Sequence, residues 1–146
     1  DDPLQSFGVM YLAGDFGGAF AEVFGANTRY KTVSLQALRT RLVSTVVGAV
    51  PAILIDLTGA GLLQIGADSR LFAAGHTQSL KWSRALHEHP RRVDGLLYRA
   101  RRDPSQYSVA LFDRYGAQVS VTQQSPLLLS PDLRGALKRY GLSILP

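Results

Sequence analysis

The sequence predicts an α+β fold, a compact single domain of short strands with a few helices. The 146 residues suit one hydrophobic core, and 46% apolar with 18% charged residues is typical of a globular chain. The strand-like segments do not alternate regularly with helices, as a parallel sheet would require. We expect residues 1–146 to form one domain, with some N-terminal residues of that domain upstream of Asp1.

The first half of the chain contains a predicted helix and three predicted strands. Asp15 is a suitable N-cap for a helix that runs to about Phe24 and ends at Gly25. Leu62–Ile65 is expected to form one helical turn. Runs of apolar and β-branched residues predict the strands Val9–Ala13, Leu38–Val47 and Ile53–Leu57.

The second half contains two longer predicted helices. One is His76–His87, with Thr77 as N-cap and Pro90 beyond its end. The other begins at Ser130-Pro131-Asp132, with Ser130 as cap, and ends at Lys138-Arg139-Tyr140 before Gly141. Strands are expected at Leu96–Tyr98, Val109–Phe112, Val119–Thr122 and Gly141–Leu145.

The net charge of +5 is concentrated in residues 81–102. This segment has seven Lys and Arg residues against Glu88 and Asp94, an excess of five. A local positive field attracts phosphates, nucleic acid or an acidic protein, although such a segment can also be an ordinary solvated face. One hypothesis is therefore a non-enzymatic nucleic-acid-binding module that uses residues 81–102, with Trp82 and Tyr98 stacking on bases or packing in the core.

Several familiar site classes find no support in the sequence. The chain has no cysteine and no apolar run long enough to span a membrane, so we expect a cytoplasmic protein without a membrane partner. His87 and His89 are two apart on a helix and diverge by about 200°, so we expect no metal. Gly59-Ala60-Gly61 suggests a dinucleotide motif, but Gln64 replaces its third glycine.

Glu22 and Tyr11 are the leading candidates for catalysis. Glu22 is a single acid among Ala, Phe and Val on a short helix, and a carboxylate is costly to bury without a function. Alternatively, Glu22 is an exposed acid paired with Arg29 or Lys31, and Tyr11 is a core residue of its strand.

Several segments together resemble the RES domain, a family of bacterial toxins. The resemblance extends from about Phe7 to Phe112 and depends on the order and spacing of motifs that are loose individually. These motifs are Gly8-Val9-Met10-Tyr11-Leu12-Ala13, Ala19-Phe20-Ala21-Glu22-Val23, Ile55-Asp56-Leu57-Thr58, His76-Thr77-Gln78-Ser79-Leu80-Lys81-Trp82-Ser83 and Asp94-Gly95-Leu96-Leu97-Tyr98-Arg99-Ala100-Arg101.

The resemblance implies an ADP-ribosyltransferase-like fold and a toxin that consumes NAD+ as its substrate. ADP-ribose would pass to a protein target, to phosphate or to water. It further implies a cognate antitoxin with a DNA-binding domain, so that nucleic acid would be reached only through the antitoxin. The basic face would then be the docking surface of that antitoxin, whose acidic tail could enter the NAD+ cleft.

The resemblance assigns catalysis to Glu22 and Tyr11. We expect Tyr11, Ser83, Tyr98, Arg99 and Arg101 to bind NAD+, with Arg102 as a further candidate for its pyrophosphate. Two departures stand out. The family's arginine has no counterpart before Tyr11, so it is lost or lies upstream of Asp1, and Ala100 occupies the position of the family's serine.

Overall fold

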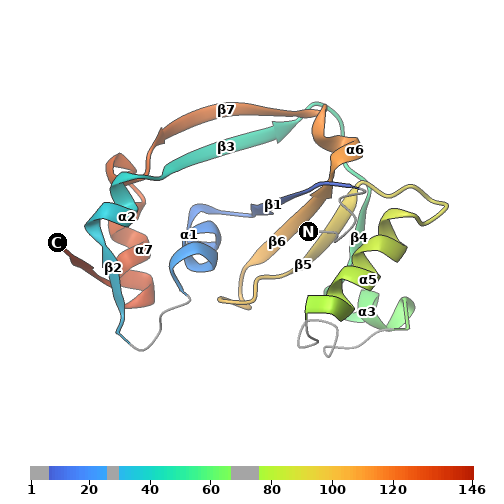
Figure 1. The fold of residues 1–146 in the computed structure, drawn as a ribbon, viewed down its shortest axis with the longest axis horizontal. Coiled ribbons are helices and arrows are strands. Elements are labelled where there is room, and N and C mark those ends of the chain that lie inside the picture. The colour runs from blue at the N-terminus through green and yellow to red at the C-terminus, as the bar shows by residue number, and fades with distance from the viewer. Residues whose placement is uncertain (1–6, 26–29, 67–75) are drawn as a thin grey trace.

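A four-stranded sheet forms the centre of the protein (Figure 1). We describe residues 7–25, 30–66 and 76–146 of a computed structural model. Strand order in the sheet is β1-β6-β5-β4, from β1 (Val9–Ala13), β6 (Tyr107–Phe112), β5 (Gly95–Arg99) and β4 (Leu54–Asp56). The β1–β6 and β6–β5 pairs are antiparallel, and β5–β4 is parallel. These four strands confirm the segments predicted from sequence.

Helix α1 (Phe16–Phe24) follows β1 and confirms the predicted start and end. The Gly18 amide donates to the Asp15 carboxylate at 2.7 Å, which satisfies one of the free N–H groups of the first turn. Phe16, Phe20 and Phe24 share one face of the helix at a spacing of four residues and pack into a hydrophobic cluster.

This first cluster unites α1 with the C-terminal segment. Its other elements are η1 (Leu127–Leu129), α7 (Leu133–Tyr140), α2 (Leu35–Arg39) and, through Val33, the strand at Thr32–Ser34. Its buried residues are Phe20, Val33, Leu38, Leu127, Leu133 and Ala136. Beside it, β2 (Thr32–Ser34) pairs in parallel with β8 (Ser143–Leu145). The predicted C-terminal strand is confirmed, and Gly141 adopts the left-handed conformation (φ 63°) that ends α7.

The strand predicted at Val119–Thr122 extends over Val119–Pro126, and the helical turn predicted at Leu62–Ile65 is a short helix over Ala60–Gln64. Two further boundaries also differ from the prediction. Leu38 was expected in a strand but lies in α2, which Ser34 caps by accepting from the Ala37 amide at 3.4 Å, and β3 (Leu42–Gly48) begins only afterwards. Leu38 is fully buried, so burial of the helix face outweighed its strand-like neighbours. At α7, the N-cap is Asp132 rather than Ser130, whose hydroxyl instead accepts from the Asp132 amide.

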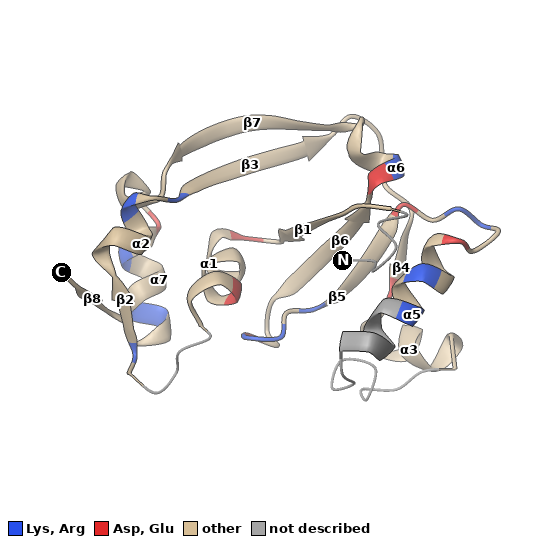
Figure 2. Ribbon diagram, viewed as in Figure 1, with Lys and Arg blue, Asp and Glu red and all other residues tan. Residues whose placement is uncertain are grey.

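Strands β3 and β7 (Val119–Pro126) form a separate antiparallel ribbon. In Figure 1 the ribbon arches from the α2 and α7 end of the molecule to α6 (Asp113–Gly116). Figure 2 shows both strands without charged residues.

Helices α5 (His76–His87) and α3 (Ala60–Gln64) lie at the β4 end of the sheet (Figure 1). The bounds predicted for α5 are confirmed, but the prediction of Thr77 as its N-cap is wrong, because Thr77 is the second residue of the helix. Leu86 of α5 packs with Val93 and Phe112 in a second hydrophobic cluster. The observed architecture is therefore the α+β class predicted from sequence.

No helix within the described residues is long and apolar enough to cross a membrane.

Candidate active site

A cleft of about 1230 Å³ opens over one face of the four-stranded sheet. Its walls come from α1, from the segment after β4 and from α5, and its rim includes the turn between β5 and β6. All six residues predicted to form the site line this cleft: Tyr11, Glu22, Ser83, Tyr98, Arg99 and Arg101. The structure thus brings together side chains that lie up to 90 positions apart in sequence.

Glu22 reaches the cleft because α1 has two different faces. Ala19, Glu22 and Val23 line the cleft, whereas Phe20 is buried in the first cluster. Glu22 itself is exposed, and its carboxylate accepts a hydrogen bond from the Arg102 backbone amide at 3.0 Å. Lys31, one of the partners considered from sequence, forms no ion pair with it among the described residues, and Arg29, the other, lies outside them. The acid that sequence analysis expected to be costly to bury is accessible from the cleft.

The floor of the cleft is set by strand register. Ala13, Ser108 and Tyr98 stand side by side in one row, and Tyr11, Ala110 and Leu96 form the next row. Because side chains alternate across a sheet, these two rows point to the same face. The alanines leave space between the two tyrosines, and Tyr11 is 64% exposed, so it is not the core residue considered as an alternative.

Tyr98 and Ser108 form a polar pair in this floor. A hydrogen bond joins their side chains, and burial together with the nearby Tyr11 and Glu22 raises the pKa of Tyr98 to about 12. The phenol therefore remains neutral at physiological pH and can donate a hydrogen bond. Sequence analysis missed Ser108, which is 2% exposed, although a serine at an inward position of the apolar run Tyr107–Phe112 was a usable signal.

The arginines occupy the rim. Arg99 borders the cleft, but its guanidinium stacks over the Tyr107 ring at 4.0 Å from the centroid. Because Arg99 and Tyr107 alternate with Tyr98 and Ser108, this stack lies on the face of the sheet opposite the cleft floor, which does not support the predicted role of the Arg99 side chain. Arg101 is exposed in the following turn. Arg102 contributes its backbone amide to Glu22 and is not among the lining residues, so its predicted side-chain role has no geometric support.

The segment after β4 closes the cleft on the opposite side. The Thr58 amide and hydroxyl both donate to Asp56 (2.7 and 2.6 Å), and these bonds hold the pKa of the Asp56 carboxyl below its ordinary value. A Cβ at Gly61 would lie 1.9 Å from the Asp56 carbonyl oxygen, so the turn into α3 requires glycine there. This tight turn accounts for the glycines that suggested a dinucleotide motif.

The α5 wall contributes Trp82 and Ser83, both half-buried. Ala100, at the position of the expected serine, also lines the cleft and is 1% exposed. The serines that line the cleft are Ser83 and Ser108. The described residues contain no group of three His, Asp or Glu side chains that could hold a metal ion.

The fold and cleft define an α+β domain with an acid, two tyrosines and arginines around one large substrate-sized cavity. The family model of the RES domain matches residues 1–130, and the chain belongs to this family.

One curated relative is named "Probable toxin y4kH", from Sinorhizobium fredii (strain NBRC 101917 / NGR234). It is 38% identical over 80 residues, which are 53% of this chain and 61% of the relative, less than two thirds of its length. No solved structure matched the chain.

Proposed function

We propose that this protein is the toxin of a toxin–antitoxin pair and that it cleaves NAD+ at the nicotinamide–ribose bond. The observation that carries this proposal is the convergence of Glu22, Tyr11, Tyr98 and Arg101 on one cleft. Family membership and the printed name of the relative support the toxin role. The volume of about 1230 Å³ is ample for a dinucleotide.

The chemistry requires few groups. As the bond between the ribose C1′ and the nicotinamide nitrogen breaks, its electron pair stays with the nitrogen and positive charge develops on the ribose. Nicotinamide leaves as a neutral molecule, so no general acid is needed. The Glu22 carboxylate, held by the Arg102 amide, stabilises the oxocarbenium-like state, as carboxylates do in glycoside cleavage.

The remaining residues bind the substrate in this proposal. Tyr11, exposed in the cleft, stacks on the nicotinamide ring, while the neutral Tyr98 hydroxyl, held by its bond to the buried Ser108, bonds to a ribose oxygen. Arg101 at the rim binds the pyrophosphate. Water, phosphate or a protein nucleophile then captures the ribose C1′, and product analysis identifies which.

A cognate antitoxin with a DNA-binding domain is the proposed partner. The structure divides the basic segment 81–102: Arg91 and Arg92 precede β5, whereas Arg101 and Arg102 follow it, and Figure 2 shows positive residues at both ends of this strand. Arg101 borders the cleft, so an acidic antitoxin segment bound there would block access to it. This separation disfavours one continuous nucleic-acid-binding face on residues 81–102.

Nicotinamide release from NAD+ tests the enzymatic proposal. Glu22→Gln retains an acceptor for the Arg102 amide but removes the charge, and we expect release to fall by about 10²–10³-fold. Glu88→Gln is the matched control because Glu88 is an exposed acid directly after α5 that does not line the cleft, 3.6 Å from Arg84. No release by the wild type, or equal release by Glu22→Gln and Glu88→Gln, would overturn the proposal.

A further inference from the structure

The contact between Glu22 and the Arg102 amide joins two elements that are 80 residues apart. Glu22 comes from α1, and Arg102 comes from the turn at 100–106 that connects β5 to β6. The turn closes through two internal bonds, from the Gln106 amide to the Asp103 carbonyl (2.8 Å) and from the Ala100 amide to the Gln106 carbonyl (2.9 Å). The position of the carboxylate therefore depends on how this turn approaches α1.

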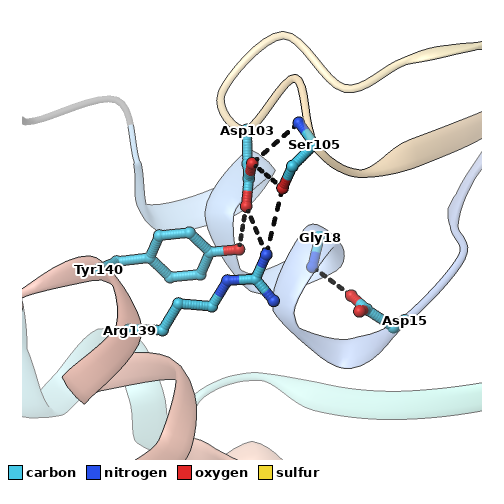
Figure 3. Close-up of polar contacts among 6 residues, drawn as sticks. All are labelled: Asp15, Gly18, Asp103, Ser105, Arg139 and Tyr140. Carbon is cyan, nitrogen blue, oxygen red and sulfur yellow. Dashed lines mark hydrogen bonds and ion pairs between the residues drawn. The ribbon is translucent and has the colours of Figure 1, made fainter.

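Helix α7 holds the turn from outside. The Tyr140 hydroxyl donates to the Asp103 carboxylate at 2.9 Å, and the Arg139 guanidinium donates to the same carboxylate oxygen at 3.0 Å (Figure 3). Arg139 also donates to the Ser105 hydroxyl at 3.3 Å, and Ser105 in turn donates to Asp103. Hydrogen bonds from Ser105 and Tyr140 hold the pKa of Asp103 below its ordinary value, so the ion pair persists at neutral pH.

The same arginine reaches the start of α1 through Gln106. The orientation of the Gln106 amide that satisfies both neighbours places its NH2 group 3.0 Å from an Asp15 carboxylate oxygen and its carbonyl oxygen 2.7 Å from Arg139. Asp15 is the N-cap of α1, the helix that presents Glu22 (Figure 3). Arg139 thus contacts the turn directly and the helix through one side chain.

Helix α7, which provides Arg139 and Tyr140, is held in place by apolar packing. Leu133 and Ala136 fix α7 in the first hydrophobic cluster, and the Tyr140 ring stacks on Phe20 of α1 with centroids 6.5 Å apart. Residues 133–140 also lie beyond residues 1–130, the part of the chain that matches the RES domain. The two side chains that hold the turn, Arg139 and Tyr140, therefore come from a segment outside the family match.

We infer that Arg139 and Tyr140 are positioning residues for Glu22, acting through Asp103 and Gln106 to fix the 100–106 turn against α1. Neither side chain lines the cleft. The functional consequence rests on the proposed role of Glu22, whereas the positioning itself is a property of the structure and can be measured separately.

Hydrogen exchange of the Arg102 amide measures the positioning without any enzymatic assay. In Glu22→Ala, which removes the acceptor, we expect this amide to exchange about tenfold faster than in the wild type. Arg139→Gln should produce a similar acceleration at Arg102, while amides inside β5 and α1 keep their protection. Arg134→Gln is the matched control, since Arg134 is exposed on the same helix and has no hydrogen bond or ion pair within the described residues. Unchanged exchange at Arg102 in Arg139→Gln would overturn the inference, as would a uniform acceleration across α1 and β5.

Kinetics of nicotinamide release measure the consequence. Tyr140→Phe keeps the ring against Phe20 and removes only the bond to Asp103, so its fold is retained. We expect kcat to fall about tenfold in Arg139→Gln and less in Tyr140→Phe, with KM for NAD+ within about twofold of the wild type. Arg139→Lys, which retains the charge opposite Asp103, should recover part of the loss.

The two proposals fail in different ways. An inactive wild type with faster Arg102 exchange in Arg139→Gln overturns the proposed function and supports the positioning role. An active wild type whose Arg102 exchange and kcat are both unchanged in Arg139→Gln overturns the positioning role and leaves the proposed function standing.

Discussion

The central strand β6 and the ribbon strand β7 are both free of charged residues, yet they have opposite environments. Four of the six β6 residues are buried, whereas none of the eight β7 residues is. Strand β6 has β1 and β5 as neighbours, while β7 pairs with β3 alone among the described strands. In this protein, the burial of a strand therefore depends on how many neighbouring strands it pairs with rather than on its composition.

Core truncation should give the largest difference between the two regions. Phe112 of β6 is 1% exposed, and Phe112→Ala should lower the free energy of unfolding by about 3–5 kcal/mol. Val121 of β7 is 58% exposed, and Val121→Ala should change it by less than about 0.5 kcal/mol. Urea denaturation measures both. Similar losses would show that the ribbon is packed as tightly as the sheet.

Removing one serine hydroxyl from each region should give a smaller difference in the free energy of unfolding. Ser108→Ala removes a buried hydroxyl and its bond to Tyr98, and should cost about 1 kcal/mol. In the ribbon, the Gln124 side chain donates to Ser44 at 2.8 Å in an exposed pair, and Ser44→Ala should cost less than about 0.5 kcal/mol because water replaces the bond. The reverse order of the two losses would contradict this account.

The pH dependence of stability should also separate the regions. Burial raises the pKa of Tyr98 to about 12 from an ordinary 10.0, so the folded state retains a proton that the unfolded chain releases. This stabilising contribution is complete below pH 10 and is lost as the pH rises through 12. Urea midpoints across this range should fall less steeply in Tyr98→Phe than in the wild type. The ribbon strands contain no titratable side chain, so Val121→Ala should leave the slope unchanged.

The smallest effect on stability is expected from a charge placed on the ribbon. Val121→Lys should change the free energy of unfolding by less than about 0.5 kcal/mol, because the side chain already faces solvent. Uncharged strand edges favour association, so light scattering at high concentration should show less self-association in this variant. A loss above about 1 kcal/mol would indicate that Val121 packs against another part of the protein.

Local signals in the sequence predicted most of the regular elements. Asp15 and Gly25 marked the ends of α1, and the bounds of α5 were as expected. The signal for α2 was also local, a capping Ser34, but the apolar and β-branched run that includes Leu38 favoured a strand. Burial of Leu38 in the folded protein favoured the helix over the strand.

The sequence predicted residues that line one cleft, but it did not predict the contacts that hold them in place. The resemblance to the RES domain indicated Glu22 and Tyr11, and the cleft contains both. Ser108, the Arg102 amide and the contact of Arg139 with Asp103 were missed, because each depends on partners brought together by the fold. Pairings between positions tens of residues apart leave no periodic pattern in a single sequence.

The β1–β6 pairing has a consequence for how the protein is made. Val9 pairs with Phe112, and Glu22 meets Arg102, so both halves of the cleft are separated by most of the chain. During synthesis, the ribosome must release residues beyond 112 before the first strand finds its neighbour. A nascent chain therefore lacks the complete cleft until β6 has emerged from the ribosome.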